Sequence, residues 1–305
     1  MIFLIVFGSI FLALLIIFFL LLLWIYKKFF YSKKKGRNNE YNVDVLQLGT
    51  EKEKFVSLID KIRQVPYEDL WIKSHDGLKL HGYFYENKKS NHFILLFNGY
   101  RGIPRRDYCG KGLQLMAMGK NVILCDQRAH GLSEGHVISL GRKEQYDVVS
   151  WVNFVQEKWG KNAKITVGGT SMGASVVLLA SDKLPPEVSI FADSAYCSQK
   201  DLIEHLIKYK KLNPKIFWPI VYLSALLFGH FKLKDDASIN VSKSKNKILI
   251  FHCTEDIIVP IKTVEKLFTC NEEHVQVVKF EGLNHAFAFY QQAEKYQKVL
   301  SEFLG

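Results

Sequence analysis

The chain has 305 residues, 48% of them hydrophobic, and a formal net charge of +11. This length and composition suit one large domain or two small ones, with ample apolar material for a packed core. The five cysteines form no Cys-x-x-Cys pair, which argues against a disulfide or zinc framework and indicates free thiols in a reducing compartment.

The first predicted element is a membrane-spanning helix. Ile2 to Tyr26 contains no charged residue and consists mostly of Leu, Ile and Phe. At about 1.5 Å per helical residue, this run is long enough to cross a bilayer. A cleaved signal peptide needs a basic start, a shorter apolar core and a small-residue cleavage site, and none is visible. We therefore predict that residues 1–26 form an uncleaved transmembrane anchor.

A basic flank follows the anchor. Its cations all precede the first acid, Glu40, and are Lys27, Lys28, Lys33, Lys34, Lys35 and Arg37. Because such flanks stay on the cytoplasmic side, we expect a single-pass protein of the cell membrane with its bulk in the cytoplasm. The flank supplies much of the net charge. We interpret it as a stop-transfer signal that meets anionic lipid headgroups, and we expect no nucleic-acid partner.

Residues 27–65 are predicted to contain this flank, a tether and a short helix. The stretch Gly36 to Thr50 is polar and lacks periodicity, which is typical of a tether. A short amphipathic helix is indicated next by apolar residues at helical spacing, which are Phe55, Leu58, Ile59 and Ile62.

Residues 66–305 show strands alternating with helices. A β-hairpin comes first, with strands at Trp71 to Ser74 and Leu78 to Tyr85 around a turn at Asp76-Gly77. The later predicted strands are Phe93 to Phe97, Asn121 to Cys125, Ile165 to Val167, Val188 to Phe191, Lys247 to Phe251 and Val275 to Phe280. The predicted helices are Tyr108 to Met118, one with Val148, Val152, Val155 and Trp159 on one face, one after Ser171, Ile261 to Phe268, and Ala286 to Phe303. Continuous apolar strands separated by helices predict an α/β fold with a mostly parallel sheet and helices on both faces.

A Gly-x-Ser-x-Gly motif lies where one strand is predicted to turn into a helix. Its residues are Gly169, Ser171 and Gly173, after the apolar run Ile165 to Val167 and before the apolar run Ala174 to Ala180. A serine on such a sharp turn takes a strained conformation that only small neighbours tolerate, and its hydroxyl stands clear of the backbone. We predict Ser171 as a nucleophile; the alternative is a tight structural turn.

Two later motifs could supply the partners of Ser171. Asp256 and its neighbour Glu255 follow a predicted buried strand, and His285 lies between the last strand and the final helix. A serine hydroxyl is a poor nucleophile until an imidazole takes its proton, and a carboxylate orients that imidazole. Asp193, which ends another strand, is the alternative acid, or else a loop-capping residue.

From about Tyr67 to the C-terminus, these motifs and their order resemble the α/β-hydrolases. The chain looks most like bacterial single-pass-anchored members related to the prolyl-oligopeptidase-like and acyl-ester hydrolases. The resemblance implies Ser171 as nucleophile, Asp256 as acid and His285 as base, in the family's chain order. We expect His130, His230 and His252 to be structural.

The resemblance also implies an oxyanion hole made of two backbone amides. One is the Met172 amide, and the second comes from the loop after the first central strand, where Tyr100 stands between Gly99 and Gly102. This sequence has Asn98 where the family often has His. That difference matters little if the donor is the Tyr100 backbone. The stretch Asp126 to Ser133 resembles a structural loop of the family, in which we expect Arg128 to pair with a carboxylate.

A small helical cap is predicted at about residues 197–244, because this segment is far longer than an ordinary connection. Its apolar centre, Ile216 to Phe228, is too short for a second span. It contains Trp218, Tyr222 and Phe228, which we predict either to pack on the domain or to bind the acyl part of a substrate.

The sequence therefore predicts a membrane-anchored serine hydrolase that cleaves small ester or thioester substrates. The alternatives are a peptidase of the prolyl-oligopeptidase-like type and a catalytically silent membrane-tethered scaffold. The sequence contains no phosphate-binding Gly-x-x-x-x-Gly-Lys-[Ser/Thr] loop, no Gly-x-Gly-x-x-Gly opening a helix and no His-Glu-x-x-His motif. We accordingly expect no cofactor and no metal, with membrane lipid and an acyl substrate as partners.

Overall fold

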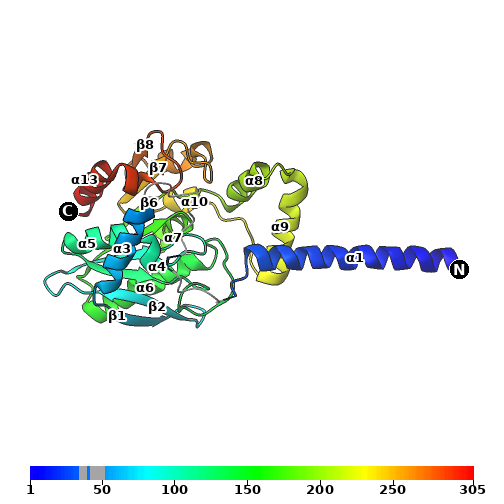
Figure 1. The fold of residues 1–305 in the computed structure, drawn as a ribbon, viewed down its shortest axis with the longest axis horizontal. Helices are drawn as coiled ribbons and strands as arrows, with labels where there is room; N and C mark the ends of the chain where they lie inside the picture. Colours follow the sequence, from blue (N-terminus) through cyan, green and yellow to red (C-terminus); the bar gives the residue numbers. More distant parts are fainter. Residues whose placement is uncertain (34–39, 42–51) are drawn as a thin grey trace.

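The computed structural model describes residues 1–33, 40–41 and 52–305. Helix α1 (Ile2–Phe29) projects from an α/β domain as one long helix (Figure 1). It continues three residues beyond the predicted end at Tyr26 and includes Lys27 and Lys28 in its last turn. Most of the predicted tether, Gly36 to Thr50, lies outside the described residues.

The domain is built on an eight-stranded sheet in the order β1-β2-β4-β3-β5-β6-β7-β8. The first two strands pair antiparallel with each other, β2 pairs antiparallel with β4, and all other pairs are parallel. The strands are β1 (Glu68–Lys73), β2 (Lys79–Tyr85), β3 (His92–Phe97), β4 (Asn121–Cys125), β5 (Lys164–Thr170), β6 (Ser189–Asp193), β7 (Ile248–Cys253) and β8 (Val275–Phe280). The predicted mostly parallel sheet is confirmed, and its hairpin turns at Gly77, whose φ is +91°.

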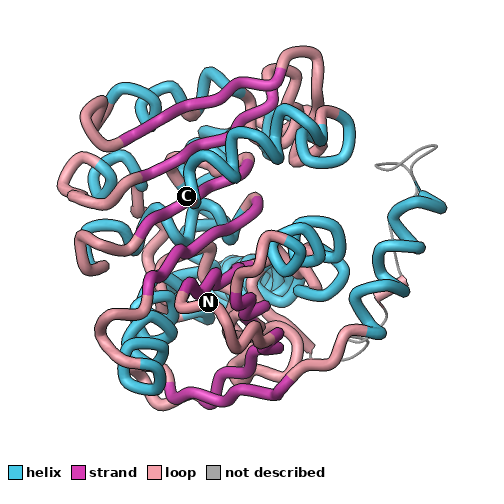
Figure 2. The backbone as a smooth tube through the Cα atoms, turned by 90° about the vertical axis from the view of Figure 1, so that its left-hand side faces the viewer, coloured by secondary structure: helices cyan, strands magenta, loops and turns pink. Residues whose placement is uncertain are grey.

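The apolar strands are buried on both faces because side chains alternate across a sheet. In β3, Phe93, Leu95 and Phe97 enter one buried cluster, while Ile94 and Leu96 enter a second cluster on the opposite face. Figure 2 shows the strands side by side with helices on both sides of the sheet. The continuous apolar runs in the sequence reflect these two cores.

The helices divide between the two cores. The second cluster takes residues from α3 (Lys52–Gln64), α5 (Cys109–Ala117), α12 (Ala288–Gln291) and α13 (Ala293–Leu304). The first takes residues from α6 (Glu144–Trp159), α7 (Met172–Ala180), α10 (Ala237–Val241) and α11 (Glu265–Thr269). The remaining short helices are α4 (Pro104–Asp107), η2 (Ser181–Lys183) and η3 (Ile261–Thr263).

Two predicted helices differ from the structure. The helix expected from Ile261 to Phe268 is divided into η3 and α11. The helix expected from Ala286 to Phe303 is divided into α12 and α13 at Gln292, whose backbone leaves the helical region with φ −125° and ψ 52°. This division sets the loop that carries His285 apart from the final helix.

The long segment between β6 and β7 forms three helices, of which the first two lie at the end of the domain from which α1 emerges (Figure 1). These are α8 (Gln199–Tyr209), α9 (Pro214–Gly229) and α10. In Figure 1, α9 runs across α1 near the base of that helix. The apolar centre of the segment is therefore next to the predicted anchor.

Candidate active site

Ser171 lies on a sharp turn between β5 and α7. Its φ of 57° and ψ of −118° are a strained combination for a residue with a side chain. Gly169 and Gly173 make the turn possible. A Cβ on Gly169 would lie 2.2 Å from the Gly173 carbonyl carbon, and one on Gly173 would lie 1.8 Å from the Phe97 oxygen. The Ser171 amide also donates to the Asp193 carbonyl oxygen at 2.8 Å.

The turn brings Ser171 into a hydrogen-bonded chain with His285 and Asp256. The Ser171 Oγ lies 2.9 Å from His285 Nε2, and His285 Nδ1 lies 2.6 Å from Asp256 Oδ2. Since a carboxylate only accepts hydrogen bonds, Nδ1 carries the proton and Nε2 is left to accept from the serine hydroxyl. The three residues come from the ends of β5, β7 and β8, which meet at one edge of the parallel sheet.

Asp256 is held by its own loop. Its Oδ1 accepts from the amides of Ile258 at 2.9 Å and Val259 at 2.7 Å. Its neighbour Glu255 is exposed, while Asp256 is buried. His252 donates from Nε2 to the Val259 carbonyl at 2.9 Å, and burial lowers the pKa of this imidazole. His252 is thus a neutral, structural residue behind the acid.

Asp193, the alternative acid, is engaged elsewhere. Its carboxylate forms an ion pair with the Lys111 ammonium, and it accepts from the Tyr296 hydroxyl at 3.1 Å and from Ser194 Oγ at 3.0 Å. Asp193 is fully buried, and none of these contacts involves His285. The structure therefore brings Asp256, and not Asp193, to the imidazole.

The ion pair of Lys111 and Asp193 connects the segments around Ser171. Lys111 also donates to Thr170 Oγ1 at 3.0 Å, one residue before the serine. Ser194 accepts from the amide of Ala286, the residue after His285, at 3.0 Å. Sequence reasoning missed this network, because a lysine in a Gly-Lys-Gly run on a helix carries no signal of a distant buried partner.

Two backbone segments border the serine. Met172 is the first residue of α7, so its N–H has no acceptor within the helix. On the other side, a Cβ on Gly99 would lie 3.5 Å from the Ser171 Cβ, which places the loop after β3 beside the serine. The imidazole of His130 fixes this loop by accepting from the Arg101 amide at 3.0 Å. Tyr100 thus lies in the loop segment that the sequence predicts as an oxyanion donor.

The same loop is attached to the inner end of α1. The Tyr100 hydroxyl donates to the Phe29 carbonyl at 2.7 Å, and the Arg101 guanidinium donates to the Lys28 carbonyl at 2.7 Å. Both acceptors lie in the last turn of α1, where carbonyls lack partners within the helix. Two neighbouring side chains therefore join the border of the serine site to the predicted anchor.

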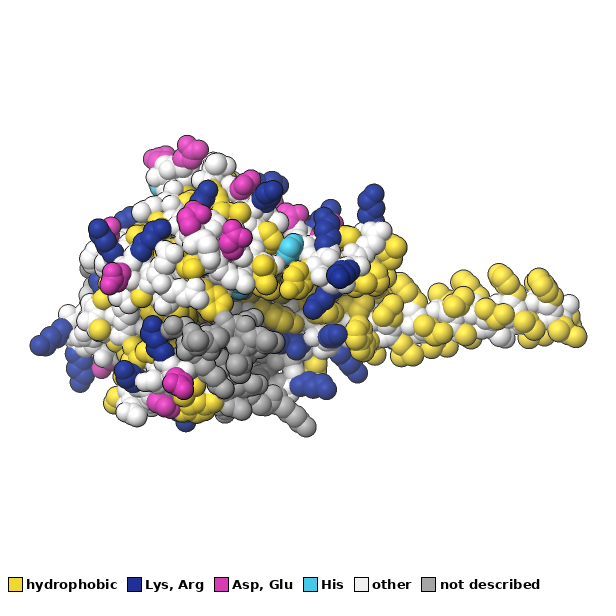
Figure 3. Space-filling view, turned by 45° about the horizontal axis from the view of Figure 1, so that its top comes forward, with side chains coloured by type: hydrophobic (Ala, Val, Ile, Leu, Met, Phe, Trp, Pro, Cys, Tyr) yellow, Lys and Arg dark blue, Asp and Glu magenta, His cyan; other side chains and the backbone are white. Residues whose placement is uncertain are grey.

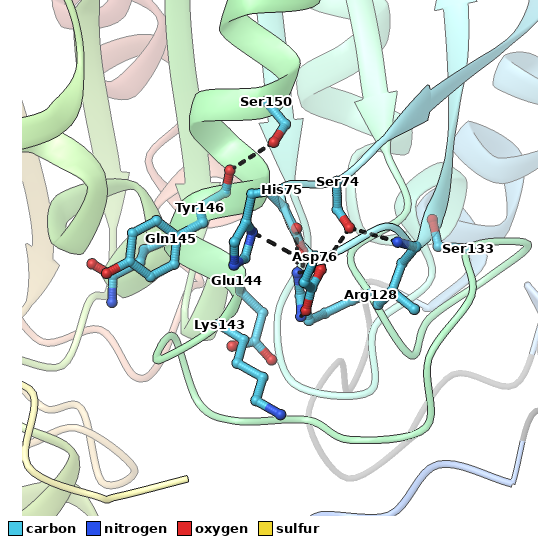
Figure 4. Close-up of polar contacts among 12 residues, drawn as sticks. Ser74, His75, Asp76, Arg128, Ser133, Lys143, Glu144, Gln145, Tyr146 and Ser150 are labelled. Carbon is cyan, nitrogen blue, oxygen red and sulfur yellow. Dashed lines mark hydrogen bonds and ion pairs between the residues drawn. The ribbon is translucent and has the colours of Figure 1, made fainter. Parts of the chain in front are cut away.

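Arg128 occupies the one group of side chains in the described residues that has the ligand types of a metal site, His75, Asp76 and Asp147. Its guanidinium bonds to Asp147 at 2.6 and 2.7 Å and to Asp76 at 2.8 and 3.0 Å, as Figure 4 shows for Asp76. The Arg128 hydrogen bond holds the pKa of Asp76 well below its usual range. The predicted pairing of Arg128 with a carboxylate is confirmed, and the group is an ion-pair cluster of the scaffold.

The three cap residues that the sequence predicts to bind substrate all belong to α9, but they pack against different parts of the molecule. Trp218 and Tyr222 are partly buried against the first core cluster, with ring centroids 5.9 Å apart. Phe228 packs instead against α1, with its ring 5.2 Å from Phe19 and 5.9 Å from Tyr26. The assignment of Phe228 to a substrate pocket does not fit this position, because its ring contacts α1.

Comparisons of sequence find one family model and two curated proteins that are similar to parts of the chain. Residues 89–221 match the family of serine aminopeptidases, S33. The uncharacterized protein YqkD of Bacillus subtilis is 24% identical over 193 residues, which are 61% of this chain and 63% of that protein. The uncharacterized membrane protein YNL320W of Saccharomyces cerevisiae is 24% identical over 249 residues, 79% of this chain and 81% of that protein.

Comparisons of structure find the same fold in known enzymes. The Pyrococcus furiosus esterase Pf2001 superposes with a TM-score of 0.66 at 23% identity, covering 80% of this chain and 92% of the esterase. The esterase EaEST of Exiguobacterium antarcticum gives a TM-score of 0.59 at 15% identity, covering 78% of this chain and 99% of that chain. At these identities the likeness concerns the fold.

Proposed function

We propose that this chain, which belongs to the α/β-hydrolase superfamily, is a membrane-anchored serine hydrolase that cleaves ester or thioester bonds of acyl substrates. The observation that carries the proposal is the hydrogen-bonded chain Ser171–His285–Asp256 on a strained turn. Strain of this kind persists only where the surrounding structure enforces it, and it concentrates at functional sites.

In the proposed reaction, Ser171 Oγ attacks the acyl carbon while His285 Nε2 takes its proton. Asp256 stabilises the resulting imidazolium, and the amides of Met172 and Tyr100 stabilise the charge on the carbonyl oxygen. The imidazolium then gives its proton to the leaving alcohol or thiol, which leaves an acyl-enzyme. A water molecule, deprotonated by His285, releases the carboxylic acid and restores the serine. This cycle uses no cofactor and no metal.

The proposed substrate is an acyl compound and not a polypeptide. Between β6 and β7, the described chain inserts only α8, α9 and α10, which offer an apolar surface with Trp218 and Tyr222. Each CH₂ that such a wall buries contributes about 0.8 kcal/mol of affinity. The named esterases among the structures with this fold also support the choice.

A comparison of substrates tests this proposal. The full-length protein in detergent should hydrolyse p-nitrophenyl esters, and Ser171→Ala should lower kcat by several orders of magnitude. Aminoacyl p-nitroanilides should be turned over far more slowly. Faster cleavage of the anilides would favour the aminopeptidase activity named by the matching family. A folded protein that cleaves neither class would favour the silent scaffold.

The proposal places α1 across the cell membrane. The helix has a mean hydropathy of 3.2 over its most apolar 18 residues, none of them buried. Leu22 and Ile25 at its base are buried against the domain. With Lys27 and Lys28 at that base, the positive-inside rule puts the α/β domain in the cytoplasm.

A further inference from the structure

The base of α1 marks the level of the membrane surface. From Ile2 to Leu21 the side chains are exposed, a run of about 20 residues or roughly 30 Å, which matches the hydrocarbon thickness of a bilayer. At the end of this run Trp24 is 55% exposed, and the ammonium of Lys28 lies 4.6 Å from its ring centroid. Trp and Lys side chains of this kind favour the headgroup region. The surface therefore lies close to Trp24.

Helix α9 crosses α1 at this level. Ser224 Oγ donates to the Leu22 carbonyl at 2.8 Å, and Phe228 contacts the rings of Phe19 and Tyr26. Figure 1 shows α9 running across α1 and not along it. With α1 perpendicular to the membrane, α9 therefore lies along the membrane surface.

The outer face of α9 carries an uncovered apolar stripe. Ile216 and Leu227 are 58% and 46% exposed, and Ile220 and Leu223 between them are partly exposed. These four residues follow one another at helical spacings of three or four and so share one face. The face on which Ser224 lies packs against α1. A helix that is apolar on both faces needs a second apolar environment for its outer face.

A basic turn borders this stripe. The turn between α8 and α9, taken with the adjoining helix ends, combines two exposed apolar side chains, Tyr209 and Leu212, with four lysines, which are Lys208, Lys210, Lys211 and Lys215. Figure 3 shows the apolar side chains of α1 continuing onto the domain at its base, with Lys and Arg side chains around them. The apolar stripe of α9 is continuous with α1, a helix long enough to span a bilayer, and it is bordered by lysines. Both observations indicate that an anionic membrane leaflet covers this face of α9.

We propose that α9 is an interfacial helix, embedded in the surface of the bilayer that α1 spans, with Ile216, Ile220, Leu223 and Leu227 facing the acyl chains. The lysines of the basic turn then meet anionic headgroups. The hydrogen bond from Tyr100 to Phe29 holds the loop beside Ser171 at the same level. The inference therefore extends the proposed function, on which this last step rests: the acyl substrate reaches Ser171 from within the bilayer.

Depth measurements with nitroxide labels test the position of α9. Four native cysteines are buried, so the partly exposed Cys270 is replaced by serine, and single cysteines are introduced as Leu12→Cys, Ile216→Cys and Leu227→Cys. The control is Ile239→Cys on α10, where the native side chain is 54% exposed. The full-length protein is placed in phosphatidylcholine vesicles that contain phosphatidylglycerol, and the accessibility of each label to oxygen and to a water-soluble nickel chelate is compared.

We expect labels at 216 and 227 to favour oxygen, as the label at 12 does, and the label at 239 to favour the chelate. A membrane-embedded label at 12 with water-exposed labels at both 216 and 227 would overturn the interfacial position of α9 and leave the span intact. Water exposure at 12 would overturn the span and with it the inference. Neither outcome depends on enzyme activity, so both are independent of the proposed chemistry.

Turnover of two substrates tests the lateral supply. Leu227→Glu should lower hydrolysis of a long-chain ester held in the vesicles by roughly tenfold, because a charge disfavours insertion of α9. It should leave hydrolysis of water-soluble p-nitrophenyl acetate unchanged, and Ile239→Glu should affect neither rate. Equal rates of Leu227→Glu and the wild type on the vesicle ester would contradict lateral supply. If the wild type hydrolyses neither ester, that result would instead contradict the proposed function.

Discussion

At the scale of single residues, the site depends on which carboxylate reaches His285. Asp256 lies 2.6 Å from the imidazole and receives two backbone amides, whereas Asp193 pairs with Lys111. One acid can therefore orient the histidine, and the other holds the surrounding segments together. The two carboxylates should respond differently to removal of their charge.

Asp256→Asn should lower kcat for p-nitrophenyl esters by roughly four orders of magnitude, because the amide no longer holds the imidazole in the required tautomer. Glu255→Gln is the matched control, since this neighbour is exposed and should keep the wild-type rate. Steady-state kinetics on proteins with wild-type circular dichroism measures both. A smaller loss in Asp256→Asn than in Asp193→Asn would reverse the assignment of the acid.

Ser171 could be predicted because it follows an apolar strand on a sharp turn that requires glycines at fixed spacing. Asp256 and His285 also follow apolar strands, and the resemblance to the α/β-hydrolases implied their roles. Lys111 could not be predicted. Its partner Asp193 is distant in sequence, and a buried ion pair leaves no local pattern. His130 was expected to be structural, but its partner could not be predicted, because the imidazole accepts from a backbone amide, that of Arg101.

At the scale of elements, the strands were predicted well and the last helices less so. The strands can be recognised in the sequence as continuous apolar runs, because their side chains enter a buried core on each side of the sheet. The stretch Ala286 to Phe303 contains neither glycine nor proline, so its pattern suggested one helix. The break at Gln292 comes from the backbone conformation there, which sequence periodicity does not encode.

Helix α9 offers a direct test of the predicted acyl pocket. If Trp218 lines it, the enzyme should prefer medium-chain p-nitrophenyl esters over acetate, and Trp218→Ala should reduce that preference more than it lowers acetate turnover. Phe228→Ala is the control on the same helix, because Phe228 contacts α1. The ratio of kcat/KM for octanoate and acetate is the measurement. An unchanged ratio in Trp218→Ala would leave this helix with a packing role only.

The junction of β3 and β5 should make stability sensitive to acid. His92 begins β3, is buried, and contacts Thr166 of β5 through Nε2 at 2.8 Å. Burial lowers its pKa from 6.5 to about 3. The unfolded chain therefore binds a proton between these values that the folded chain does not. The contribution of His92 to the free energy of unfolding therefore has its full value above pH 6.5. As the pH falls from 6.5 toward 3, the free energy of unfolding decreases by up to about 1.4 kcal/mol per pH unit.

Denaturant unfolding of the full-length protein in detergent between pH 7 and pH 4.5 measures this dependence. His92→Gln keeps a group able to bond with Thr166 and has no imidazole, so its stability should fall less steeply with acid than that of the wild type. Parallel curves for the two proteins would show that His92 does not contribute.

At the scale of the whole molecule, the domain and α1 form one connected structure. The base of the helix bonds to the loop after β3 through Tyr100 and Arg101 and to α9 through Ser224. The sequence predicted an anchor and a cap separately. It gave no sign that they touch, because all three of these bonds are accepted by backbone carbonyls, which every residue possesses.

The orientation of this assembly is a prediction in its own right. With Lys27 and Lys28 on the cytoplasmic side, protease added to intact cells should leave the domain uncut, and permeabilised cells should lose it. Immunoblotting with an antibody to the C-terminal helix measures both, and a known surface protein serves as the digestion control. Complete digestion in intact cells would place the domain outside.

The most direct test of a serine hydrolase is the site at which a fluorophosphonate probe reacts. Membranes that contain the full-length protein are treated with the probe, and the labelled peptide is identified by mass spectrometry. We predict a single phosphonyl adduct on Ser171, which lies 2.9 Å from its base, and no adduct in Ser171→Ala or His285→Ala. An unlabelled Ser171 in the folded wild-type protein, or equal labelling of Ser171→Ala, would contradict the proposed function.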